Sequence, residues 1–308
     1  MSKQKPFVIA SESIPTTSKT VEWQQQNSAS FAFTLSHSAK NSQQKIVTIV
    51  ENMQQAESLL QDLAFFGHQA TIFPDTETLP YDSFSPQLNI ISERLATLAR
   101  LRQGAINTLI VTIPTLMQHL APLQFLDGHV LVLKPGDIVD RDQWRLGLEA
   151  SGYQNVKQVM EPGEFAIRGA IIDLFPMGIT TPIRVDLFDD EVESIRTFDP
   201  ETQRTVETIP ELSILPAREF DTSPKALELF QKKFKNSFEV DTTKCNLYKE
   251  IVNGNLPAGV ENYLPLFFDD TATLFDYLGE QTTFITYPNL YKSAESFQKL
   301  IDTRYERY

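Results

Sequence analysis

The sequence has few of the residues on which metal and redox sites depend. Its 308 residues include one cysteine and four histidines. A single thiol can form no internal disulfide, which is typical of a protein in a reducing compartment. The histidines are far apart, without the paired spacing of a zinc site. We therefore expect no disulfide and no metal from Cys245, His37, His68, His119 and His129.

A phosphate-binding loop is also missing. The first glycine is Gly67, and the pattern Gly-x-x-x-x-Gly-Lys-Ser/Thr occurs nowhere. The triplet Ser18-Lys19-Thr20 resembles the end of that pattern, but without a glycine the backbone cannot wrap closely round a phosphate. No Ser/His/Asp or Cys/His set can be assigned either. These residues predict a chain that is not an enzyme and uses no cofactor.

Long apolar runs are missing too. No stretch of about 18 apolar residues occurs, so we expect no membrane span. Residues 1–12 contain two lysines but only a short apolar run, unlike a secretory signal. These features favour a cytoplasmic protein.

The charge balance argues against DNA as the main ligand. The chain has 27 Lys and Arg against 40 Asp and Glu, a net charge of −13. Binding to a phosphate backbone draws its free energy from clustered basic side chains. Residues 130–216 are the most acidic part, with 16 acidic and 8 basic side chains. Arginines there are expected to pair with carboxylates or with a protein partner.

The first part of the chain alternates strands and helices, which predicts a parallel sheet covered by helices. Residues 130–133 would add one more strand. We expect strands at residues 45–50, 69–73 and 108–113, and helices at 54–66, 90–101 and 115–120, with Pro114 as the first residue of the last helix.

After residue 136 the pattern changes to short β-branched runs. We expect a helix at residues 141–150, then strands at 165–175, 183–188 and 191–198. Asp189-Asp190 fits a tight turn, which makes the last two strands antiparallel. With Glu191 these carboxylates could also suggest a metal site, but solvated carboxylates at a turn are the simpler interpretation.

The last third is α/β in character. A helix from Ser223-Pro224 to about Phe238 places Ala226, Phe230 and Phe234 on one side. The sequence ends within an amphipathic pattern, so we expect it to be part of a longer protein.

The strand at residues 183–188 carries the most informative side chains. Alternation places Ile183, Val185 and Leu187 on the buried face, and Arg184, Asp186 and Phe188 on the other. A phenylalanine on a charged face either covers a second small core, packs under a loop or anchors a protein contact, since aromatic and arginine side chains dominate such contacts. Arg168 would join this face if its strand lies alongside. Arg196 and Arg204 are weaker candidates, because each has carboxylates nearby.

Six motifs in order resemble the amino-terminal region of the transcription-repair coupling factors (Mfd family), and together they span essentially the whole chain. They are Glu-Thr-Leu-Pro-Tyr-Asp-Ser-Phe-Ser-Pro at 77–86, Ile-Ser-Glu-Arg-Leu at 91–95, the run from Gly-Glu-Phe-Ala-Ile-Arg-Gly at 163–169 to Asp-Leu-Phe-Pro-Met-Gly at 173–178, Asp-Asp-Glu through Arg-Thr-Phe-Asp at 189–199, Leu-Pro-Ala-Arg-Glu-Phe at 215–220, and Leu-Pro-Ala-Gly-Val-Glu at 256–261.

The resemblance implies an α/β multidomain fold similar to the helicase UvrB. Residues 1–129 would form domain 1a, a parallel α/β unit without a phosphate loop, and residues 217–308 domain 1b. Together these two would be a degenerate RecA-like domain. Residues 130–216 would form the inserted domain 2, mixed and mainly antiparallel.

The resemblance also implies a function. Domain 2 would bind the excision-repair protein UvrA, and by motif position Arg168, Arg184 and Phe188 would make the contact. We expect both guanidinium groups to meet UvrA carboxylates, with Phe188 in an apolar pocket between them. The chain would act as a non-catalytic UvrB mimic that recruits UvrA in transcription-coupled nucleotide excision repair, a DNA-damage response.

The full-length family members carry further machinery. They use ATP and Mg²⁺ in a DNA translocase that displaces stalled RNA polymerase, and they bind polymerase and DNA through other domains. The resemblance also implies that the parent's carboxy-terminal domains mask this region. An autoinhibitory scaffold is therefore the alternative function, and a nucleotide-dependent helicase or nuclease is a third, opposed by the missing loop and the acidic charge.

Overall fold

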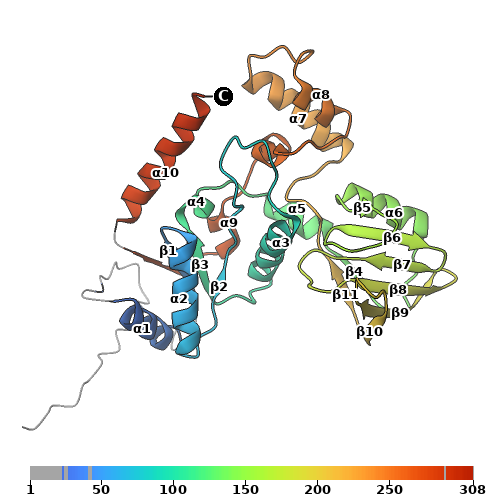
Figure 1. The fold of residues 1–308 in the computed structure, drawn as a ribbon, viewed down its shortest axis with the longest axis horizontal. Coiled ribbons are helices and arrows are strands. Elements are labelled where there is room, and N and C mark those ends of the chain that lie inside the picture. The colour runs from blue at the N-terminus through green and yellow to red at the C-terminus, as the bar shows by residue number, and fades with distance from the viewer. Residues whose placement is uncertain (1–22, 24–26, 41–43, 288, 308) are drawn as a thin grey trace, which may run out of the picture.

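The computed structural model describes residues 23, 27–40, 44–287 and 289–307, so the triplet Ser18-Lys19-Thr20 lies outside the described residues. The fold is α/β, with a parallel sheet and a separate mixed sheet (Figure 1). Within the described part of the chain, no helix has the length and apolar character needed to cross a membrane. Among the same described residues, no group of three or more His, Cys, Asp or Glu side chains is placed to hold a metal ion.

The parallel sheet has the order β12-β1-β3-β2, and every neighbouring pair in it is parallel. Its inner strand β1 is almost fully buried, and four of its six residues are apolar. Strand β12 comes from the last third of the chain, so this sheet is assembled from both ends of the sequence. The strands are β1 (Lys45–Val50), β2 (Thr71–Ile72), β3 (Thr108–Thr112) and β12 (Thr282–Thr286).

Helices cover both faces of this sheet. On one face, α1 (Ser28–Lys40) and α2 (Met53–Phe65) pack Leu35, Leu59 and other apolar side chains against β1 and β3. On the other face, α3 (Leu88–Arg102) and α9 (Leu274–Leu278) join the largest hydrophobic core. The strands predicted at 45–50 and 108–113 and the helices predicted at 54–66 and 90–101 are thus confirmed to within two residues, as β1, β3, α2 and α3. Helix α1 was not predicted.

The strand expected at residues 130–133 is present as β4 (Leu131–Leu133). It lies outside the parallel sheet and pairs antiparallel with β11 (Leu212–Ile214). One helix expected in this region is wrong. The helix expected at 115–120 is instead the single turn α4 (Ile113–Leu116), which begins at Ile113 because the side chain of Thr112, two residues before Pro114, caps it.

The second sheet has six strands in the order β10-β9-β8-β7-β6-β5, and all its pairs are antiparallel except β5 with β6. It packs its inner face on α6 (Arg141–Ala150), whose Leu148 is fully buried in the largest core. The strands are β5 (Gln154–Asn155), β6 (Glu164–Arg168), β7 (Ile171–Leu174), β8 (Ile183–Phe188), β9 (Glu191–Phe198) and β10 (Thr205–Thr208).

The single strand expected at 165–175 is wrong, because the chain reverses in its middle. Strands β6 and β7 form an antiparallel hairpin, in which Ala166 pairs with Asp173 and Arg168 with Ile171. Gly169 makes the reversal, with a φ of 61° that side chains rarely adopt. The turn at Asp189-Asp190 is as expected, and Asp189 has a φ of 54°.

The last third of the chain forms a separate aromatic cluster, which also includes Phe125 of α5 (Leu123–His129). The cluster is built on α7 (Pro224–Ser237), which Ser223 caps as predicted, and it buries Ala226, Phe230 and Phe234. Figure 1 shows α10 on the opposite side of the molecule from the six-stranded sheet. The remaining elements are α8 (Asn246–Val252), the 3-10 helix η1 (Val260–Leu266) and α10 (Leu290–Tyr305).

Several of the sequence motifs meet where these parts join. Arg94 on α3 is 2% exposed and donates to Glu219 at 2.9 Å, and its guanidinium lies 4.7 Å from the ring of Phe73. Ser85 donates to Glu261 at 2.7 Å and accepts from the backbone of Gly259 at 3.0 Å. These motifs therefore join the first part of the chain to its last third.

Candidate functional site

The candidate site lies on the outer face of the six-stranded sheet. Strand β8 is buried at alternate residues, with Ile183, Val185 and Leu187 inside, as the period of two predicts. Arg184 pairs in register with Asp173 on β7 and with Arg196 on β9. Because directly paired residues share a face, these charged side chains lie together on the face away from α6.

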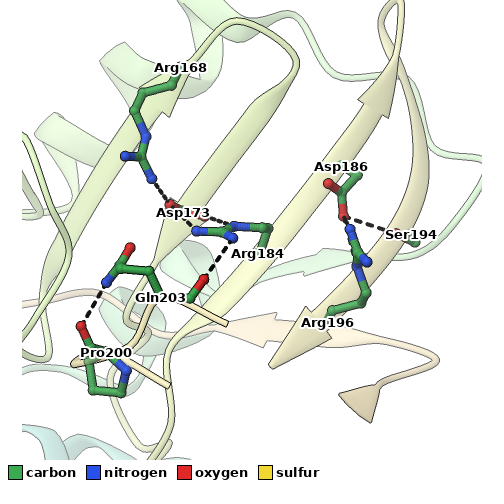
Figure 2. A network of polar contacts seen from close by, with 8 residues as sticks. All are labelled: Arg168, Asp173, Arg184, Asp186, Ser194, Arg196, Pro200 and Gln203. Atoms are coloured by element: carbon green, nitrogen blue, oxygen red, sulfur yellow. Dashed lines mark hydrogen bonds and ion pairs between the residues drawn. The ribbon is translucent and has the colours of Figure 1, made fainter. Parts of the chain in front are cut away.

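Arg184 and Asp173 are joined by Arg168 on β6, and we call these three residues the arginine clamp (Figure 2). Arg184 donates to both carboxylate oxygens of Asp173, from Nε at 2.7 Å and from Nη2 at 2.9 Å. Arg168 donates from Nη2 to Oδ2 of the same carboxylate. The Asp173 side chain is fully buried, so two guanidinium groups compensate one carboxylate that has no access to water.

The two arginines of the clamp are not equivalent. The Arg184 side chain is 15% exposed, and its Nη1 also donates to the carbonyl of Gln203 at 3.2 Å. Its guanidinium lies 4.8 Å from the ring of Phe198. The hydrogen bonds to Asp173 raise the pKa of Arg184 above its ordinary value. The Arg168 side chain is 50% exposed, and among the described residues its one polar contact is with Asp173, so Arg168 is the member that faces solvent.

A second ion pair lies beside the arginine clamp. Arg196 donates from Nε and Nη2 to Oδ2 of Asp186, at 3.0 and 2.5 Å, and Ser194 donates to the same oxygen at 3.0 Å. Arg196 is thus paired within the chain, as its neighbouring carboxylates suggested. Arg204 is exposed, and no hydrogen bond or ion pair joins its side chain to another described residue.

Phe188 stands at the end of β8, and 71% of its surface is exposed. The outer face does have a second small core, which includes Ala166, Phe175 and Phe198, but Phe188 lies outside it. The interpretation that Phe188 covers such a core is therefore wrong. The backbone of Leu187 donates to the carbonyl of Ala170, which places Phe188 beside the turn that follows Arg168.

Asp173 is the member of the site that the sequence reasoning missed. Its signal was a single carboxylate within the apolar run Ile171-Ile172-Asp173-Leu174. A buried charge is costly unless it is paired, so an acidic residue inside such a run predicts a basic partner on a neighbouring strand. The sequence analysis did not predict the hairpin at Gly169, so it could not show that Arg168 forms an ion pair with Asp173.

The loop where a parallel α/β sheet would hold phosphate differs from a phosphate-binding loop. Between β1 and α2 it consists of Glu51 and Asn52. Asn52 Oδ1 accepts from the backbone of Gln55 at 3.0 Å, and Gln55 Oε1 accepts from the backbone of Glu51 at 2.9 Å. Two backbone N–H groups at the start of this helix are thus already bound by the chain's own side chains.

Comparison with known proteins identifies the class of this six-stranded unit. The family model described as the UvrB interaction domain matches residues 131–220, which contain the arginine clamp and Phe188. The six-stranded unit is therefore similar to the UvrB interaction domain.

The particular relatives are transcription-repair-coupling factors. The chain is 44% identical over 278 residues to the one from Haemophilus influenzae, covering 90% of this chain and 24% of the relative. It is 44% identical over 263 residues to the Escherichia coli protein and 34% over 265 residues to that of Rickettsia bellii, covering 85% of this chain and 23% of each relative. The chain thus spans about a quarter of these relatives, and the recognition of their amino-terminal region from the motifs is confirmed.

Proposed function

We propose that this chain is the UvrA-recruiting module of a transcription-repair coupling factor, acting in transcription-coupled nucleotide excision repair. The similarity to coupling factors and the UvrB interaction domain support a role in this repair pathway. The observation that carries the proposal is the outer face of the six-stranded sheet, where ordered arginines lie beside an exposed phenylalanine. Arginine and aromatic side chains are the usual anchors of protein contacts.

The geometry suggests separate roles for the three residues. Phe188, already exposed on an ordered strand, would enter an apolar pocket of UvrA with little loss of conformational entropy. Arg168 has donors left on its exposed guanidinium and would meet a UvrA carboxylate. Arg184 uses its donors inside the chain, so we assign it to positioning Asp173 and Arg168 rather than to direct contact.

We propose no catalysis for this chain. The self-capped loop between β1 and α2 and the net charge of −13 support that view. The parent would bring ATP, Mg²⁺, DNA and RNA polymerase to other domains, and its carboxy-terminal domains would mask the UvrA surface until polymerase is engaged.

The test is a calorimetric titration of this chain into UvrA from the same organism, with and without UvrB. If the chain is a UvrB mimic, its titration into UvrA gives a saturable heat of binding. Excess UvrB then abolishes this heat, because UvrB and the chain occupy the same surface of UvrA. An absence of binding would refute the recruiting function and favour the autoinhibitory scaffold. Binding that UvrB leaves unchanged would refute the mimicry.

A further inference from the structure

A second exposed apolar side chain lies next to Phe188. Ile138, in the segment between β4 and α6, is 74% exposed. It forms an antiparallel bridge with Glu191, which pairs on its other side with Phe188. Paired residues share a face, so Ile138, Glu191 and Phe188 form one row with the carboxylate in the middle. We call these three residues the Ile138–Phe188 row. At ordinary ladder spacings its two apolar ends are about 10 Å apart.

The backbone that carries Ile138 is fixed to the neighbouring turn. The backbone of Val139 donates to the carbonyl of Asp190 at 2.7 Å, and that of Val192 donates to the carbonyl of Asp137 at 2.9 Å. The Val139 side chain is 1% exposed and anchors the segment in the largest core. Alternation then directs Ile138 outward.

Arg141 fixes this end of the sheet further. Its Nη1 donates to the carbonyl of Gly169, and its Nη2 to Oδ1 of Asp190, both at 3.2 Å. One guanidinium thus connects the turn that follows Arg168 with the turn that follows Phe188. The Ile138–Phe188 row is therefore held in place before any partner arrives.

A single exposed apolar side chain would need no explanation, because most protein surfaces contain some. Here two such side chains flank one residue, on backbone that hydrogen bonds hold rigid. Both lie within residues 131–220, which match the UvrB interaction domain. Arg168, half exposed, belongs to the hairpin whose turn Arg141 contacts. The row and the arginine clamp therefore belong to one continuous end of the sheet.

We propose that Ile138 is a second apolar anchor of the partner-binding surface, acting together with Phe188. The partner would present an apolar ridge that spans the row. It would also bring a donor or a cation opposite Glu191, because a carboxylate buried without a partner is costly. This inference rests on the proposed function, and it extends the surface onto the segment that precedes α6.

The experiment measures the affinity of UvrA for the wild-type chain and for Ile138→Ala, Phe188→Ala and Val206→Ala by calorimetry. Val206 is the matched control, since it is β-branched and 71% exposed. It lies on β10, which pairs with the far end of β9, about 20 Å along the strand from Glu191. Because these residues are exposed, we expect the thermal midpoint of every variant to stay at the wild-type value.

We expect Ile138→Ala to weaken binding about tenfold, as truncation of an anchor residue does, while Val206→Ala stays within about twofold of wild type. If Phe188→Ala weakens binding but Ile138→Ala matches the control, the inference is overturned and the proposed function stands. If the wild-type chain does not bind UvrA, the proposed function fails and the inference fails with it.

Discussion

Removing the carboxylate of Asp173 should destabilise the six-stranded sheet. The Asp173→Ala substitution leaves Arg184, which is 15% exposed, without the two hydrogen bonds that compensate its charge. Breaking a buried ion pair costs about 3–5 kcal/mol, and the lower end applies here because Arg184 keeps some access to water. Arg168 is half exposed, so its contact adds only about 0–1 kcal/mol. We expect a loss of about 3–4 kcal/mol in the free energy of unfolding.

Urea denaturation measures this loss, because a lower midpoint at unchanged slope reports reduced stability. The matched control is Asp142→Ala. Asp142 is also paired with an arginine, Arg145, but its side chain is 88% exposed. We expect the control to stay within about 0.5 kcal/mol of wild type. A loss below about 1 kcal/mol for Asp173→Ala would show that the arginine clamp does not stabilise the sheet.

Three further predictions concern the rest of the chain. Glu219→Ala leaves Arg94 buried and unpaired, so urea denaturation should show a loss of about 3–5 kcal/mol, and a near-neutral result would contradict the role of this bridge. Burial lowers the pKa of His68 below its ordinary 6.5, and the positive charge of Lys40 adds to this. The unfolded chain then binds a proton at His68 more readily than the folded chain does. The urea midpoint of unfolding should therefore fall as the pH drops below about 6.5 toward the lowered pKa. In the His68→Gln variant the urea midpoint should depend less on pH over this range. Mg-ATP should leave the thermal midpoint unchanged, because a nucleotide bound well above its dissociation constant would raise it by mass action.

The charged outer face of β8 could be predicted from the sequence because a strand has a strict period of two. Ile183, Val185 and Leu187 define the inner face without reference to any other strand. The tight turn at Asp189 is similarly local. Helix α7 was predictable as well, since Ser223 as cap and three apolar residues at helical spacing are enough to define it.

What the sequence could not supply were long-range pairings. Strand β12 joins β1 although Thr282 lies 237 positions after Lys45, the residue with which it pairs. The antiparallel pairing of Leu131 with Ile214 likewise depends on distant segments. The contacts of Asp173 depend on a hairpin register that one glycine sets. Local patterns predict which face a side chain occupies, but its partner across the sheet follows only from the assembled register.

The proposed mechanism makes Phe188 the main apolar anchor, and one comparison tests it most directly. The affinity of UvrA is measured for Phe188→Ala and for Phe65→Ala, a phenylalanine on α2 that is 85% exposed and lies outside the interaction domain. We predict that Phe188→Ala weakens binding about tenfold or more, with an unchanged thermal midpoint, while Phe65→Ala binds as wild type does. Equal affinity of the two variants would contradict the proposal that this face of the sheet recruits UvrA.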